Sequence, residues 1–124
     1  MCQEFDLNLD KEVIPQIAYL FAGGIGNTGS VCGAVAGAVM AIALMKGRGE
    51  TMEEMMGRLG LAQEFRRKFE KEMNYIHCRE LTGLDLTTQE GMEQLMKSDI
   101  SQKVCFPAVG LAFQLVMEIL KDNN

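Results

Sequence analysis

An uncharged, glycine-rich stretch, GGIGNTGSVCGAVAG, occupies residues 23–37 and limits what the chain can fold into. Glycine adopts backbone conformations that other residues avoid, and inside a helix it costs about 1 kcal/mol relative to alanine. The stretch therefore predicts a loop followed by a helix whose small residues permit close packing. Such a segment has three interpretations: a nucleotide-binding loop, a membrane span, or a frame that positions Cys32.

The nucleotide interpretation rests on Gly24, Gly26 and Gly29, which have the G-x-G-x-x-G spacing of dinucleotide-binding loops. Glu50 lies about 20 residues further on, near the place of the acid that binds the ribose. That mechanism requires β-strands around the loop, whereas both flanks here have helical patterns. A Walker loop is excluded because no lysine precedes Ser30. We expect no bound nucleotide.

The membrane interpretation rests on residues 31–45, which carry no charge. As a helix these residues span about 22 Å. A helix that crosses a bilayer core is longer, because it needs roughly 20 residues. Gly33 and Gly37 form a GxxxG pair, and Ala34 and Ala38 continue the ridge of small residues. The same geometry suits the central helix of a soluble bundle. The length favours a buried central helix and no membrane insertion.

Helical periodicity and capping signals continue along the rest of the chain. Helix N-caps are expected at Asp10, at Thr28 or Ser30, at Thr51 with Glu54, and at Thr87 with Glu90. Helical segments are expected over residues 11–21, 31–46, 55–60, 63–76, 77–83, 88–96 and 105–121.

Three of these segments have apolar residues spaced three or four apart, as on one face of a helix. The faces comprise Val13, Ile14, Ile17, Ala18 and Phe21; Phe65, Phe69, Met73 and Ile76; and Ala108, Leu111, Ala112, Leu115, Val116, Ile119 and Leu120. No alternating strand pattern of useful length occurs. The sequence predicts one all-α domain over residues 1–124, a compact bundle of five to six helices around the small-residue-rich central helix.

Charge and composition restrict the partners. The net charge of −5 argues against nucleic acid, which binds to basic surfaces. No cationic start followed by an apolar stretch opens the chain, so we expect a cytoplasmic protein in a reducing compartment. The four cysteines are then expected to be buried thiols, metal ligands or redox thiols, and no CxxC motif distinguishes among these.

Three cysteines occupy positions where a thiolate could be stabilised. If Ser30 caps the second helix, Cys32 lies in its first turn, near the positive end of the helix dipole. Cys105 precedes Pro107, which favours a first helical turn. Cys78 lies between His77 and Arg79, two cations that would favour its thiolate if the side chains converge.

The segment CGAVAG, residues 32–37, matches the CGAxxG motif of the redox-active protein family written C_GCAxxG_C_C. The flanking residues 21–44 resemble that family's glycine loop and first long motif. HCRELTG, residues 77–83, resembles its third-cysteine segment, and residues 103–120 resemble its fourth. The resemblance implies that Cys32, Cys78 and Cys105 correspond to family cysteines, whereas Cys2 lies too close to the following segment to match the first.

The resemblance implies redox activity, with transporter-associated proteins as partners and iron centres in related domains. We therefore expect Cys32, Cys78 and Cys105 to converge for thiol–disulfide or electron-transfer chemistry, or to bind iron, an iron–sulfur centre or zinc. Cys2, His77 or an outside group would complete a metal site. The alternative is a non-catalytic helical interaction module, in which ten methionines and the small-residue ridge serve a homodimer or another partner.

Overall fold

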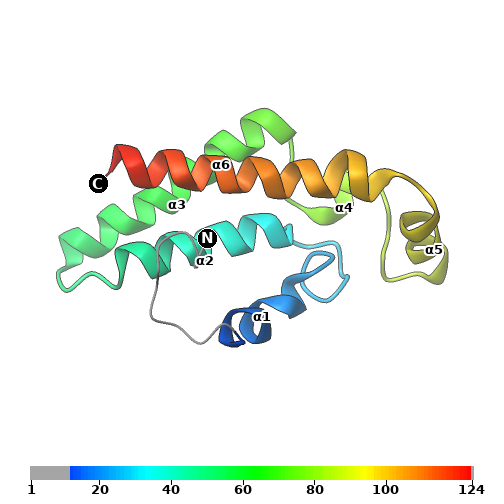
Figure 1. The fold of residues 1–124 in the computed structure, drawn as a ribbon, viewed down its shortest axis with the longest axis horizontal. Coiled ribbons are helices and arrows are strands. Elements are labelled where there is room, and N and C mark those ends of the chain that lie inside the picture. Colours follow the sequence, from blue (N-terminus) through cyan, green and yellow to red (C-terminus); the bar gives the residue numbers. More distant parts are fainter. Residues whose placement is uncertain (1–11, 124) are drawn as a thin grey trace.

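The computed structural model describes residues 12–123, which form six α-helices (Figure 1). The all-α prediction is confirmed: one isolated antiparallel bridge joins Val31 to His77, and no strand occurs among these residues. The elements are α1 (Val13–Ala18), the 3₁₀ segment η1 (Tyr19–Phe21), α2 (Gly33–Lys46), α3 (Met52–Met73), α4 (Cys78–Thr82), α5 (Gln89–Lys97), the π-helical segment η2 (Ser101–Cys105) and α6 (Phe106–Asp122).

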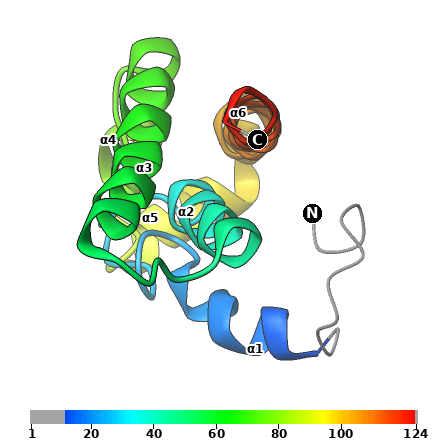
Figure 2. The ribbon, with the colours of Figure 1, turned by 90° about the vertical axis from the view of Figure 1, so that its left-hand side faces the viewer.

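Helices α2, α3 and α6 pack against one another and form the centre of the molecule. α2 and α6 begin at the same end of the bundle, and α3 runs in the opposite direction (Figure 1). Figure 2 shows α6 nearly end-on, with α3 on the left of the view and α2 between α1 and α6. The N-termini of α2 and α6 and the C-terminus of α3 therefore share one end, where α4 also lies.

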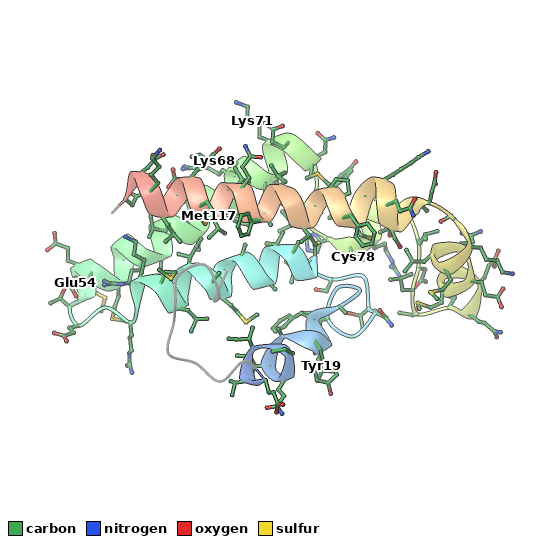
Figure 3. All side chains as sticks on the ribbon, in the orientation of Figure 1. Tyr19, Glu54, Lys68, Lys71, Cys78 and Met117 are labelled. Carbon is green, nitrogen blue, oxygen red and sulfur yellow. The ribbon has the colours of Figure 1, made fainter. Side chains whose placement is uncertain are left out.

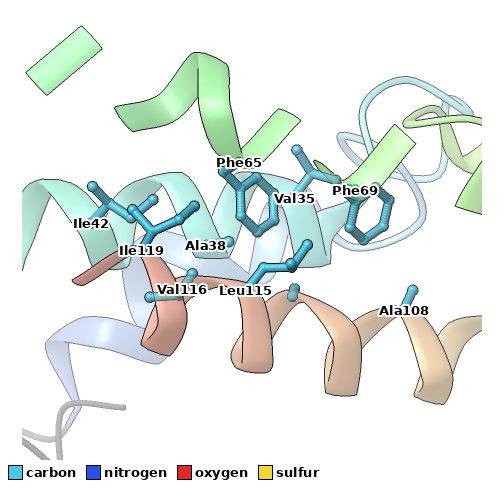
Figure 4. Close-up of a cluster of buried hydrophobic side chains, with 10 residues drawn as sticks. Val35, Ala38, Ile42, Phe65, Phe69, Ala108, Leu115, Val116 and Ile119 are labelled. Atoms are coloured by element: carbon cyan, nitrogen blue, oxygen red, sulfur yellow. The ribbon is translucent and has the colours of Figure 1, made fainter. Parts of the chain in front are cut away.

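The side chains between these helices form the main hydrophobic core (Figure 4). Phe65 and Phe69 are fully buried, and their ring centroids lie 5.8 Å apart. The predicted face of α6 is confirmed, because all seven of its members are buried or pack on this core. The buried members of the core are Val35, Ala38, Ile42, Phe65, Phe69, Ala108, Ala112, Leu115, Val116 and Ile119.

Close helix packing depends on alanines more than on the predicted glycine pair. Ala38, Ala108 and Ala112 are buried in the core, whereas an added Cβ at Gly37 would meet nothing within 4 Å. Gly33 does lie close to another segment, since its added Cβ would be 3.3 Å from the Phe21 carbonyl oxygen. The GxxxG pair thus has one member at a close contact and one facing open space.

The predicted apolar face of α1 is not buried. α1 lies on the side of α2 opposite α6 (Figures 1 and 2), so neither α3 nor α6 covers it. Of the predicted members, Val13 and Ile17 are exposed, Ile14, Ala18 and Phe21 are half-buried, and none is fully buried. The expected N-cap, Asp10, lies outside the described residues.

Segments 55–60 and 63–76 prove to be parts of one helix, α3, which continues through Gly57 and Gly60. Its N-cap is the predicted Thr51, whose hydroxyl accepts from the Glu54 amide at 3.1 Å. The helix ends before Ile76 because Asn74 adopts a left-handed conformation with φ +74°. Ile76 nevertheless packs against the core from the connecting segment.

The N-cap of α5 is Thr88 and not the predicted Thr87. The Thr88 hydroxyl accepts from the Gly91 amide at 3.0 Å, whereas Thr87 donates from its hydroxyl to the Asp85 carboxylate. Asp85 also accepts from the Thr87 amide at 3.0 Å, which fixes the preceding turn. Adjacent threonines carry equal capping propensity, and the turn made by Asp85 decides between them.

Candidate thiol site

The glycine-rich loop contains a left-handed turn. Five consecutive residues have positive φ angles: Gly23 (65°), Gly24 (76°), Ile25 (58°), Gly26 (63°) and Asn27 (63°). Their amides and the next ones donate back along the chain, including Gly26 N–H to Leu20 O at 2.7 Å. A β-branched residue rarely adopts positive φ, so the backbone of Ile25 is strained. The neighbouring glycines adopt positive φ without strain. The G-x-G-x-x-G pattern thus lies between helices, as predicted, but as a left-handed turn.

This turn packs directly against the start of α4. The Cys78 amide donates to the Ser30 carbonyl at 2.7 Å, and the Arg79 amide donates to the Gly29 carbonyl at 3.2 Å. An added Cβ at Gly24 would lie 2.5 Å from both the amide nitrogen and the carbonyl oxygen of Ser30, and 2.9 Å from the Cys78 Cβ. Glycine at position 24 therefore allows the loop backbone to touch Cys78.

Cys32 and Cys78 follow the two partners of the isolated bridge. Val31 lies opposite His77, and the Cys32 amide donates to the Ile76 carbonyl at 2.7 Å. Cys32 is the N-cap of α2 and Cys78 is the first residue of α4, so each begins a helix directly after a bridge partner. The bridge thus relates two cysteines that are 46 positions apart in the chain.

The structure shifts the start of the second helix. Cys32 is itself the N-cap of α2, and Gly33 is the first helical residue. Neither predicted residue caps α2. The Ser30 carbonyl accepts from the Cys78 amide, and the Thr28 hydroxyl donates to Gly24 O at 2.7 Å. Extended pairing of Val31 delays the helix by two residues. Cys32 still lies at the positive end of the helix dipole.

Cys105 is not at a free helix N-terminus, contrary to the prediction. It is the last residue of the π-helical segment η2, and its backbone angles are helical (φ −67°, ψ −49°) as the chain continues into α6. Pro107 lies in the first turn of α6, as expected, but η2 precedes that turn. The π-helical turn therefore separates Cys105 from any unpaired helix-end amides.

The three thiols influence one another electrostatically. Burial, and then the Cys32 and Cys105 thiolates, raise the pKa of Cys78, which a hydrogen bond with Thr82 partly offsets. Burial first and Cys32 second raise the pKa of Cys105. The expected acidification of these two thiols is therefore wrong, because apolar surroundings and like charges disfavour their thiolates. Cys32 thus contributes to both raised pKa values, and Cys105 contributes to that of Cys78.

The side chains on either side of Cys78 pair with carboxylates. His77 Nδ1 lies 3.2 Å from Glu80 Oε1, and Arg79 Nη2 lies 3.0 Å from Asp85 Oδ1. Cys78 itself turns into a second, smaller core, where Leu84 and Leu86 are buried and Met92, Leu95 and Ile100 pack around them. Adjacency in sequence therefore does not create the expected cationic environment for Cys78. The second core was not among the predicted features. The alternation of Leu84 and Leu86 in the sequence is the pattern that could have indicated this second core.

Among residues 12–123, no three His, Cys, Asp or Glu side chains form a group that could hold a metal ion. Cys2, one of the possible additional ligands, lies outside this range. Cys32 and Cys105 are partly exposed, and Cys78 is buried; none of the three forms a disulfide. Figure 3 labels Cys78, the first residue of α4, at the end of the bundle where α2 and α6 begin. The arrangement supplies three free thiols of graded exposure.

A protein-family model described as "Putative redox-active protein (C_GCAxxG_C_C)" matches residues 1–119. The chain belongs to this family. The match covers the glycine loop and all four cysteines, which confirms the family indicated by the CGAxxG segment. Comparisons with curated proteins and with solved structures find no match.

Proposed function

We propose that Cys32, Cys78 and Cys105 carry out thiol–disulfide exchange. The observation that carries the proposal is that Cys32, Cys78 and Cys105 lie at the ends of α2, α4 and η2, which meet at one end of the bundle through the Val31–His77 bridge and the packing of α4 on η2. Family membership supports redox activity in general. The unusual left-handed turn that holds Cys78 supports a specific role for this end, since strained backbone clusters at functional sites.

Cys32 is the candidate attacking thiol. It is partly exposed and occupies the N-cap of α2, where the helix dipole favours a negative charge. Cys78 is buried and carries a raised pKa, so it suits the second step, in which it meets a sulfur already bound to the protein. Cys105 is the third thiol, available to exchange with the disulfide so formed.

The reaction balances as two successive substitutions at sulfur. The Cys32 thiolate attacks one sulfur of a substrate disulfide, forms a mixed disulfide and expels the other sulfur as a thiolate. Cys78 loses its proton to solvent and attacks Cys32 Sγ, which expels the second substrate thiolate. The protein dithiol gives up two electrons and becomes the Cys32–Cys78 disulfide, and the substrate is reduced to two thiols. A dithiol redox partner would restore the protein.

The test is a thiol titration on protein purified anaerobically, with bound metal measured on the same sample. Oxidation with a small disulfide should remove two thiols, and mass mapping should find Cys32 joined to Cys78. Cys78→Ser should stop at a mixed disulfide on Cys32. Cys32→Ser is expected to fold, because serine is a favoured N-cap, and to lose the rapid first step.

Cys2→Ser is the matched control and should leave both steps unchanged. Stoichiometric metal that is lost on Cys32→Ser would replace thiol exchange by metal binding. Thiols that stay inert in the folded protein, without metal, would instead favour the helical interaction module. Each outcome therefore selects one of the three functions.

A further inference from the structure

A hydroxyl group lies beside Cys78 in its own helix. Thr82, the last residue of α4, lies four positions after Cys78, and residues at this spacing are neighbours on one face of a helix. The Thr82 hydroxyl donates to the Cys78 carbonyl at 2.8 Å, and it accepts from the Leu84 amide at 3.2 Å, which holds the oxygen in place. The proton of this hydroxyl therefore has two acceptors within reach on the same residue, the carbonyl oxygen and the sulfur of Cys78.

The other surroundings of Cys78 disfavour a negative charge on its sulfur. The side chain lies in the second core, and burial raises the pKa of the thiol. Cys32 at the start of α2 and Cys105 at the end of η2 raise it further. The side chains on either side of Cys78 pair with carboxylates. Within the described part of the chain, the hydrogen bond with Thr82 is the interaction that lowers the pKa of this thiol.

We infer that the Thr82 hydroxyl is a catalytic hydrogen-bond donor, which turns from the Cys78 carbonyl to the Cys78 sulfur when that sulfur becomes a thiolate. The inference rests on the thiol–disulfide exchange proposed above and assigns Thr82 to its second step. A buried thiolate is costly without a donor, and a hydrogen bond to a charged acceptor is stronger than the neutral one that it replaces. Rotation of the O–H bond makes the change without moving the helix.

The second step balances with Thr82 acting as a donor only. Cys78 gives its proton to solvent, and the resulting thiolate accepts a hydrogen bond from the Thr82 hydroxyl. The thiolate attacks Cys32 Sγ, so the Cys32–Cys78 disulfide forms while the bond between Cys32 and the substrate sulfur breaks. The negative charge leaves on the substrate thiolate, and the hydroxyl returns to the Cys78 carbonyl. Thr82 keeps its proton throughout.

The experiment compares the two steps of exchange in variants of Thr82, with a small disulfide as the probe. Thr82→Val keeps the shape of the side chain and removes the hydroxyl. It should form the mixed disulfide on Cys32 at the wild-type rate and resolve it about tenfold more slowly, because a hydrogen bond to a charged group is lost. Thr82→Ser keeps the hydroxyl and should recover most of the rate. Thr87→Val is the matched control, since the Thr87 hydroxyl donates to the Asp85 carboxylate. It should leave both steps unchanged.

The pH dependence of alkylation separates a missing donor from a loosened helix. Thr82→Val should move the midpoint for Cys78 to higher pH and leave that for Cys105 in place, because only the Cys78 thiolate loses its donor. A loosened helix would instead expose Cys78, which lowers its midpoint and accelerates its alkylation at high pH. Helical content measured for every variant verifies that it is folded.

Two results would overturn the role of Thr82 while leaving the exchange itself intact. One is a Thr82→Val variant that resolves the mixed disulfide as fast as the wild type. The other is a Cys78 midpoint that does not rise in this variant. A wild-type protein that forms no mixed disulfide would instead overturn the proposed exchange, and the catalytic role of Thr82 with it.

Discussion

The three-helix core and the thiol end of the molecule are held by different parts of the chain. In the core, side chains fix the structure: Phe65, Phe69, Val116 and Ile119 are completely buried among neighbours from three helices. At the thiol end, backbone groups fix it, because the carbonyls of Gly29 and Ser30, which follow the left-handed turn, accept from the first amides of α4. Buried apolar side chains therefore contribute most of the stability, whereas the backbone conformation determines where the cysteines lie.

The largest expected effect lies in the core. Phe69→Ala should lower the free energy of unfolding by about 3–5 kcal/mol, because it removes a fully buried ring and leaves a cavity. Urea unfolding measures the change. Leu59→Ala is the control, since Leu59 is 58% exposed on the same helix and should change stability by only about 0.5 kcal/mol. Equal losses for the two variants would contradict the described packing.

The next effect tests the backbone at the thiol end. Gly24→Ala should cost about 1–3 kcal/mol, because the added Cβ meets Ser30 and Cys78 and the φ of +76° disfavours alanine. It should also accelerate alkylation of Cys78 by disturbing its cover. Gly26→Ala is the matched control, with a similar φ of +63° and open space around the added Cβ. A Gly24→Ala variant no worse than Gly26→Ala would refute the close contact.

Relief of strain should give a smaller effect of opposite sign. Ile25 has a φ of +58°, which costs a non-glycine residue roughly 1–2 kcal/mol. Ile25→Gly should therefore stabilise the protein by up to about 1 kcal/mol, after the entropic cost of glycine is subtracted. Leu59→Gly, in an ordinary helical conformation, should destabilise it by about 1 kcal/mol. Thermal unfolding of both variants provides the comparison, and a loss of stability in Ile25→Gly would argue against a left-handed turn.

The smallest effect concerns pH. The raised pKa values of Cys78 and Cys105 stabilise the folded state below the ordinary thiol pKa of about 8.5, and this stability is lost as pH rises through the raised values. Alkylation of both thiols should therefore have its midpoint above about 8.5. Cys32→Ser should lower both midpoints by removing a neighbouring negative charge. Midpoints that do not move would show that the thiols are not coupled.

Much of the fold could be predicted because it depends on local signals. Thr51 caps α3, Gly47 and Gly83 follow the ends of α2 and α4, and the apolar face of α6 is buried as its spacing predicts. The apolar face predicted for α1 is not buried, for a simple reason. Periodicity identifies a face that can be buried, but not whether another helix lies against it.

Composition, periodicity and a local motif identify the helical class, the family and the three cysteines without a structure. The surroundings of each thiol, in contrast, follow from the three-dimensional packing. The Val31–His77 bridge delays α2 until Cys32 is its N-cap, and η2 removes Cys105 from a free helix end. Cys78 turns into a small core, while the neighbouring His77 and Arg79 side chains pair with Glu80 and Asp85. Burial and charge at a thiol depend on residues distant in sequence, which no local pattern specifies.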